Sequence, residues 1–204
     1  NRWLPYILSY GAPSPSFNSA SDASYFDNPI VKQAISDFLN KVKQGRDAGY
    51  IVLPADVGAS WNGEAFGKQL AAMTIEGSWT IPYLTDQFPN FKYGSDWDVS
   101  LVPNGPSGRA TMAYTVVLAM NAKSQVLDAA LKFIQFVVGV DGQKILVVKM
   151  GHTLPSIKSL SNDPDLWPSH AKELSMVGSY TKVQVFFYGS KTGDIAVSYT
   201  HLRA

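Results

Sequence analysis

The run of residues 66–79, FGKQLAAMTIEGSW, is the sequence feature that most constrains the fold. Residues 71–75 (AAMTI) form a short apolar stretch that is typical of a buried β-strand, and residues 76–78 (EGS) end it. Trp79 therefore stands just past a predicted strand end. Ligands of open α/β sheets bind in the crevice beyond the strand ends, so Trp79 is a candidate platform for a ligand. The alternative is that Trp79 is an ordinary core tryptophan at a strand end.

The residues around Trp79 suit a sugar ligand. A flat indole ring covers the C–H face of a sugar ring while polar groups meet its hydroxyls. We expect Gly77 to let the backbone approach such a ring closely, and Ser78 or Glu76 to hydrogen-bond to its hydroxyls. Trp61 stands beside an asparagine in an irregular stretch and is a second candidate contact. For Trp61 the alternative that its ring packs back onto the protein, away from any ligand, has the same weight.

Periodicity predicts several helices. Asn28 can cap a helix that has Pro29 at its first position, and apolar residues then recur at helical spacing until Gly45. A short helix is predicted over residues 81–88, where Pro89 cuts it. Further helices are predicted over residues 125–138, from Asp141 to a cap at Gly151, and over 163–177. The helix over 125–138 is expected to face inward through Val126, Leu127, Ala130, Phe133, Ile134 and Val137.

Three further apolar stretches predict β-strands. They cover residues 99–102, 112–120 and 183–188. Between the first two lies residues 104–108 (NGPSG), where two glycines and a proline in five residues indicate a tight loop.

The run at 66–79 also resembles a motif of known proteins. It is similar to the pattern G-K-x-A-M-x-x-x-G-x-W of extracellular solute-binding proteins of the maltose-binding type, the sugar receptors of ABC importers. That pattern precedes a ligand-stacking tryptophan, which corresponds to Trp79; the spacing between Gly67-Lys68 and Ala72-Met73 is longer here. Over about residues 1–190, five more segments follow the family's order: 26–29 (FDNP), 97–103 (WDVSLVP), 105–111 (GPSGRAT), 129–136 (AALKFIQF) and 151–155 (GHTLP).

The resemblance implies a fold and a function. The fold would be α/β and periplasmic-binding-protein-like of class II, with two discontinuous lobes joined by a hinge, of which this chain is an incomplete fragment. Residues 1–106 would belong to the C-terminal lobe, 107–155 to the N-terminal lobe, and 156–196 would return to the C-terminal lobe. Such a receptor captures a sugar or oligosaccharide between its lobes and delivers it to ABC transporter permease subunits. It works outside the cytoplasm, in the periplasm or lipid-anchored at the cell surface, and it needs no cofactor, no metal and no catalytic residue.

The resemblance also indicates binding residues outside the motif. Trp3 and Tyr6 lie in a segment that resembles an aromatic cleft loop of the family. Tyr114 and Thr115 stand near the first lobe crossing, where relatives commonly show glycines. This departure argues against a backbone contact with the ligand there, although Tyr114 would supply a stacking face instead.

Neither end of the chain is expected to be a natural terminus. Residues 197–204 (VSYTHLRA) match the translation of a transposase adapter used in sequencing libraries, so we expect them to be an artefact. Asn1 is not an initiator residue, and no charged segment with an apolar stretch follows it. We therefore expect the chain to begin inside a longer receptor.

Composition argues against several other functions. The 17 basic and 16 acidic residues give a net charge of +1 without a block of either sign, so nucleic-acid binding is not expected. The absence of cysteine excludes thiol catalysis and disulfides. Every apolar stretch falls short of the ~20 residues of a membrane helix. The three histidines are isolated, and the chain has neither a phosphate-binding loop nor a serine-hydrolase motif.

Three alternatives stay open. Glu64 and Glu76 flank the motif and would serve as the carboxylate pair of a carbohydrate-active hydrolase. A structural or signalling module whose cleft binds a protein would show a large exposed apolar patch. A receptor for a glycerophosphodiester or another polyol is also compatible, with Arg109 near the first crossing to meet an anionic group.

Overall fold

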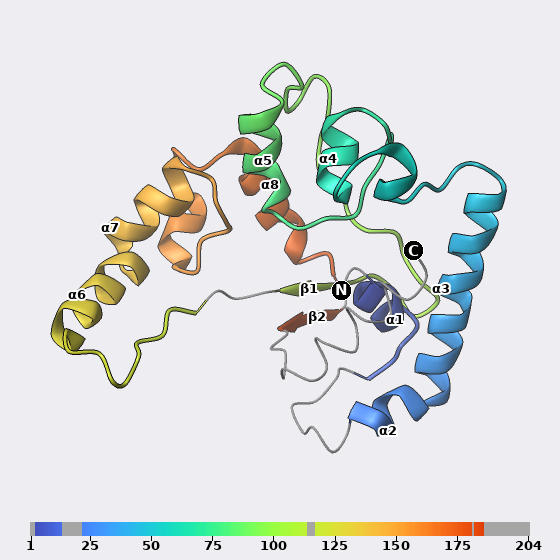
Figure 1. The fold of residues 1–204 in the computed structure, drawn as a ribbon, viewed down its shortest axis with the longest axis horizontal. Coiled ribbons are helices and arrows are strands. Elements are labelled where there is room, and N and C mark those ends of the chain that lie inside the picture. The colour runs from blue at the N-terminus through green and yellow to red at the C-terminus, as the bar shows by residue number, and fades with distance from the viewer. Residues whose placement is uncertain (1–2, 14–21, 114–116, 181, 186–204) are drawn as a thin grey trace. The chain divides into compact units, whose positions relative to one another are not determined.

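The computed structural model describes residues 3–13, 22–113, 117–180 and 182–185, which form two compact units (Figure 1). The first unit comprises the described residues of Asn1–Val52, Val102–Thr115 and Gly178–Ala204, and the second those of Leu53–Leu101 and Val116–Val177. The first contains α1 (Trp3–Ser9), α2 (Asp22–Asp27), α3 (Pro29–Asp47), β1 (Ala110–Ala113) and β2 (Lys182–Val185). The second contains a 3₁₀ helix (Pro54–Val57), α4 (Asn62–Gly67), α5 (Thr80–Gln87), α6 (Leu127–Val138), α7 (Val140–Gln143), a π-helical turn (Lys144–Lys149), a second 3₁₀ helix (Lys158–Asn162) and α8 (Pro168–Val177).

The start of α3 confirms the sequence prediction. Asn28 Oδ1 accepts hydrogen bonds from the backbone N–H groups of Ile30 at 2.9 Å and Val31 at 3.3 Å, and Pro29 occupies the first helical position. The cap satisfies two donors that have no partner inside a helix, and the proline lacks the N–H that would need one.

The predicted end of α3 at Gly45 is wrong. Gly45 is buried inside the helix, because the side chains of Tyr50 and Ile51 pack where its Cβ would stand. The helix ends at Asp47, and Gly49 follows with φ +79°. Hydrogen bonds from Gly49 N–H and Tyr50 N–H return to the last turn, which is the Schellman arrangement that favours glycine at this place.

Helix α1 is the centre of the first unit. Ile7 packs against Val31 of α3, whereas Leu4 and Leu8 pack against Ala110 of β1. The three α1 residues are at most 1% exposed. The segment expected to form an aromatic cleft loop is therefore a helix that carries core residues, whereas the binding role of Trp3 and Tyr6 stays a prediction.

The sheet is smaller than predicted. The strand expected over 112–120 is observed as β1, Ala110–Ala113, which pairs in parallel with β2. β2 covers the first part of the strand predicted over 183–188, and the rest of that prediction, like residues 114–116, lies outside the described residues. Residues 99–102 and 117–120 are not in strands.

The strand predicted over residues 71–75 is also not observed. Met73 is 87% exposed and Ile75 is 51% exposed, so the segment is not buried. Within the described residues no strand pairs with it. β-propensity favours an extended backbone, but a strand also needs a neighbour for its N–H and C=O groups, and local sequence does not specify that neighbour.

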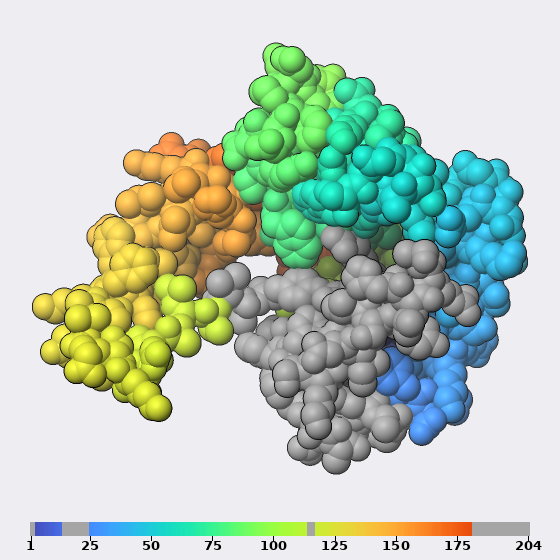
Figure 2. Space-filling view, in the orientation of Figure 1, coloured from blue at the N-terminus to red at the C-terminus, as the bar shows by residue number. Residues whose placement is uncertain are grey.

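Two apolar clusters form the core of the second unit. One joins Ile81 and Leu84 of α5, which confirms the helix predicted over 81–88, with Trp97. The other joins Val148, Leu160 and Leu166 near α8. Helices α4 and α5 pack together, and Figure 2 shows their teal and green atoms in direct contact.

Helix α6 is found where predicted, but its apolar side is not buried. Val126 and Phe133 are each 63% exposed and Leu127 is 41% exposed. Ala130, Ile134 and Val137 are half-buried. Periodicity determines which side of a helix is apolar, whereas burial needs a partner surface, which periodicity does not encode.

The last helical prediction is partly wrong. Gly151 ends the helix that starts near Asp141, as predicted, with φ +64° and a hydrogen bond of 3.0 Å from its N–H to the Val147 carbonyl. The helix predicted to start at Asp163 instead starts at Pro168. Asp163 Oδ1 accepts a hydrogen bond from Asp165 N–H, and this local turn competes with a helical first turn.

None of the described helices is both long and apolar enough to cross a membrane.

Candidate functional site

Trp79 stands at the N-terminal end of α5, not after a strand. The carbonyls of Gly77 and Ser78 accept hydrogen bonds from the first N–H groups of α5, at 3.0 and 3.1 Å. The indole lies directly on Gly77, where a Cβ would overlap the ring. Trp79 is 41% exposed. The glycine thus leaves room for a ring that is still partly open to solvent.

Glu76 and Ser78 lie beside this ring in the chain and are half-buried. Both carboxylate oxygens of Glu76 are shielded from solvent. Ser78 contributes its carbonyl to the start of α5 and has a hydroxyl as further hydrogen-bonding group. The short segment 76–79 therefore combines an aromatic face with polar groups of different kinds.

Trp61 belongs to the same unit as Trp79. It precedes α4 and its ring meets the ring of Tyr83 edge-to-face, with centroids 4.7 Å apart. Like Trp79, it lies over a glycine, since a Cβ on Gly63 would overlap the indole. Trp61 is half-buried by these contacts.

Tyr83 is a further aromatic residue of this region that was not identified from the sequence. It lies on α5 one helical turn after Trp79, so the two side chains emerge on the same side of the helix. Tyr83 also contacts Trp61 directly. The spacing of four residues between Trp79 and Tyr83 is the signal that would have found it, once residues 80–87 are recognised as a helix. Trp61, Trp79 and Tyr83 thus form a group of three aromatic residues in the second unit, the aromatic triad.

Trp3 and Tyr6 lie on α1 in the first unit, so the structure does not bring them together with the aromatic triad within one unit. The Trp3 ring packs against Phe26 at 6.4 Å between centroids, and the Tyr6 ring packs against Phe38 at 5.3 Å. Both side chains thus have structural partners within their own unit.

The hydroxyl of Tyr6 belongs to a polar network. It lies 2.9 Å from the hydroxyl of Tyr10 and accepts a hydrogen bond of 2.9 Å from Lys41 Nζ. Tyr10 in turn donates to Asp37 at 2.8 Å. The hydrogen bond with Tyr6, together with burial, raises the pKa of Tyr10 to about 12. The network joins α1 to α3 through polar groups.

The remaining predicted residues are Tyr114, Thr115 and Arg109. Tyr114 and Thr115 lie outside the described residues. Arg109 Nε donates a hydrogen bond of 2.7 Å to the Val102 carbonyl, which ties together the two ends of the 104–108 loop. That loop is a tight turn, as predicted, with Gly105 and Gly108 paired through their backbones. Among the described residues no group of three histidine, aspartate or glutamate side chains is placed to hold a metal ion.

Glu64 is unsuited to the role of a general acid. Lys68 Nζ lies 2.6 Å from its carboxylate, and the side chain and backbone of Ser60 donate to it. The contacts with Lys68 and Ser60 lower the pKa of Glu64 to about 2. A glycosidase acid needs a raised pKa so that it holds a proton near neutral pH. The environment of Glu64 shifts the pKa in the opposite direction.

Comparison with known proteins gives one match. A family model described as bacterial extracellular solute-binding protein matches residues 7–173, well over half of the chain. The matched range contains the aromatic triad, while Trp3 and Tyr6 lie just before it. Neither the curated proteins nor the solved structures give a match.

Proposed function

This chain belongs to the bacterial extracellular solute-binding proteins, and on that premise we propose that it is the carbohydrate-binding component of an ABC importer. Membership of the family supports a solute-binding role and a place outside the cytoplasm. The sugar as ligand, the capture between two lobes and the delivery to a permease are the proposal. Trp79 is the observation that carries it.

The geometry at Trp79 suits one face of a sugar ring. The indole packs against Gly77 and is 41% exposed, so part of a flat apolar ring is accessible to a ligand. A preformed surface of this kind loses little conformational entropy when a ligand binds. Trp61 and Tyr83 supply further aromatic rings in the same unit, and Ser78 supplies a hydroxyl that would hydrogen-bond to the ligand. Glu76 would do so only after its shielded carboxylate turns toward the ligand.

Capture would follow from closure of two lobes about a hinge. Under the proposal, residues 1–106 and 156–196 belong to one lobe and 107–155 to the other, so the chain passes between lobes more than once and the crossings bend together. A sugar shifts the balance toward the closed form to the extent that it binds that form better. The permease then recognises the closed receptor, and no bond is made or broken.

A hydrolase is the weaker proposal. Glu64 is held ionised by Lys68 and Ser60, so it would serve only as the base or nucleophile of the pair. Glu76 would then have to be the general acid, and both of its carboxylate oxygens are shielded from solvent. A glycerophosphodiester or polyol receptor would use the same aromatic surface, so it is separated from a sugar receptor by a binding experiment.

The test is calorimetric titration of the full-length protein with a panel of neutral mono- and oligosaccharides, free amino acids and a glycerophosphodiester. We expect a neutral sugar to bind, and Trp79→Ala to weaken it by about 2 kcal/mol or more, roughly 30-fold. Tyr50→Ala is the matched control, because Tyr50 is a 73% exposed aromatic residue of the other unit, and it is expected to leave the affinity unchanged. Binding of an amino acid in place of any sugar, or unchanged affinity in Trp79→Ala, would refute the proposal.

A further inference from the structure

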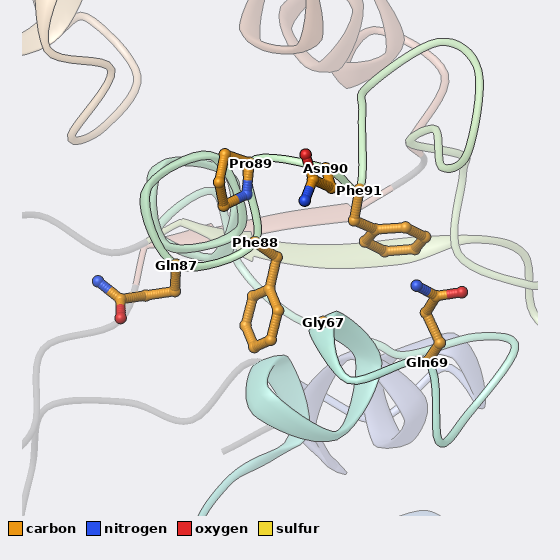
Figure 3. A pocket seen from close by; sticks show the side chains of 7 residues that line it. All are labelled: Gly67, Gln69, Gln87, Phe88, Pro89, Asn90 and Phe91. Atoms are coloured by element: carbon orange, nitrogen blue, oxygen red, sulfur yellow. The ribbon is translucent and has the colours of Figure 1, made fainter.

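A cavity of about 230 Å³ opens in the second unit between the end of α4 and the end of α5 (Figure 3). It is lined by Gly67, Gln69 and residues 87–91. No residue of the aromatic triad lines it. It is therefore a different place from the site of the proposed function, and nothing in that function uses it.

Two anchored rings form its apolar walls. Phe88 and Phe91 extend from α5 and the following loop toward α4 (Figure 3). The ring of Phe91 meets Phe66 at 5.4 Å between centroids, and that of Phe88 meets Tyr83 at 5.8 Å. A Cβ on Gly67 would overlap the Phe88 ring, so glycine is what lets this ring lie against α4. Both phenylalanines pack on the core cluster of Ile81, Leu84 and Trp97.

Three carboxamides supply the polar part. Gln69, Gln87 and Asn90 are exposed, and within the described residues their amide groups make no hydrogen bond to the protein. Each amide offers one acceptor oxygen and two donor hydrogens, which matches the mixed donor and acceptor character of hydroxyl groups. None of the lining side chains is charged. The neighbouring Lys68 is paired with Glu64 at 2.6 Å. The cavity thus favours a neutral ligand.

The backbone of Gln69 adds an independent observation. With φ +58°, it is the one non-glycine residue of positive φ among the described residues. Its N–H bonds to the Phe66 carbonyl at 2.8 Å, and Leu70 N–H bonds to the Ala65 carbonyl at 2.9 Å. This is the Schellman end of a helix, where glycine is the usual residue. A strained residue that is kept where glycine would fit better points to a use for its side chain.

We propose that this cavity binds one ring of a neutral polyhydroxylated compound, a monosaccharide or a cyclitol, between Phe88 and Phe91, with its hydroxyls on the amides of Gln69, Gln87 and Asn90. The volume lies below the ~300–1,000 Å³ of sites for drug-sized ligands, so one ring is the appropriate size. A small ligand in an open cavity binds weakly, with a dissociation constant on the order of millimolar.

The test is an NMR titration of the full-length, ¹⁵N-labelled protein with D-glucose and with myo-inositol. Side-chain amide signals of Gln69, Gln87 and Asn90 and backbone signals of residues 87–91 are expected to shift together with one saturating curve. Cyclohexanol has a similar ring but a single hydroxyl, and it is expected to bind at least ten times more weakly. Absence of these shifts with both polyols, or equal binding of cyclohexanol, would overturn the proposal.

Variants of Gln69 separate the effect of its amide group on binding from any effect on the fold. Gln69→Gly removes the amide, suits the backbone and is expected to lose about ten-fold in affinity for the polyol that binds. Gln69→Asn keeps a carboxamide on a residue that tolerates positive φ, and it is expected to retain most of the binding. Trp79→Ala is expected to leave these shifts unchanged, whether or not the proposed function holds. Undiminished binding in Gln69→Gly, or its loss in Trp79→Ala, would overturn the separate site.

Discussion

Replacing Gln69 by glycine is expected to stabilise the protein. Gln69 follows α4 with φ +58°, in the left-handed region, and its N–H and that of Leu70 close a Schellman motif. The same motif ends α3, where the corresponding residue is Gly49. The comparison indicates that Gln69 carries a conformational cost that glycine would avoid.

The size of the effect follows from two opposing terms. A residue with a Cβ in the left-handed region costs about 1–2 kcal/mol. Glycine makes the unfolded chain more flexible, which opposes the gain by about 0.4–1 kcal/mol. The two ranges leave a net stabilisation of Gln69→Gly between about 0 and 1.6 kcal/mol, and their mid-points give about 0.8 kcal/mol. For a chain of this length that corresponds to a rise of roughly 1–4 °C in Tm.

The assay is urea unfolding of the full-length protein, followed by circular dichroism, with the slope of the free energy compared between variants. Gly58→Gln is the reciprocal control. Gly58 lies in the same unit with φ +68°, and nothing lies within 4 Å of where its Cβ would stand, so its substitution isolates the conformational term. We expect Gly58→Gln to destabilise by a similar amount with an unchanged slope. If Gln69→Gly is neutral or destabilising while Gly58→Gln destabilises, the glutamine side chain stabilises the fold and the reasoning fails.

Three further substitutions test separate parts of the structure. Gly77→Ala would place a Cβ against the Trp79 ring and is expected to weaken sugar binding at least ten-fold by calorimetry; equal affinity would show that ring and glycine are not coupled. Asn28→Ala removes the cap of α3 and is expected to cost about 1 kcal/mol in urea unfolding, so an unchanged midpoint would contradict the cap's contribution. Burial raises the pKa of Glu173 to about 7, so its stabilising protonated form is fully present below the unfolded pKa near 4.3 and is lost as the pH rises through 7. Glu173→Gln is therefore expected to match the unmodified protein near pH 4 and to exceed its stability by roughly 3 kcal/mol at most above pH 7; His170, whose pKa burial lowers, is present in both proteins and does not affect the difference.

Features set by a few neighbouring residues could be predicted from the sequence. The cap at Asn28, the tight turn at Gly105 and Gly108, and the helix end at Gly151 all appear where their residue types indicate. Each depends on hydrogen bonds that close within a few residues, so the sequence around it contains both partners.

Features that need a distant partner could not be predicted in the same way. Residues 71–75 have the composition of a buried strand, yet Met73 is exposed and no strand pairs with the segment within the described residues. The apolar side of α6 has the right period but is not buried, as Phe133 shows. Gly45 has the residue type of a helix end and instead makes room for Tyr50 and Ile51. In each case the pattern describes one surface and leaves its partner unspecified.

In the candidate site, too, local features could be predicted from the sequence and contacts between distant residues could not. The sequence by itself determined that Gly77 and Trp79 stand together, because only Ser78 separates them in the chain, and the match over residues 7–173 shows the family. Only the tertiary structure decided that Tyr83 contacts Trp61 and that Gln69 lines one cavity with Phe88 and Phe91. The physical reason is that these arrangements depend on how α4 and α5 pack, and packing between elements depends on shape complementarity that no local sequence pattern encodes.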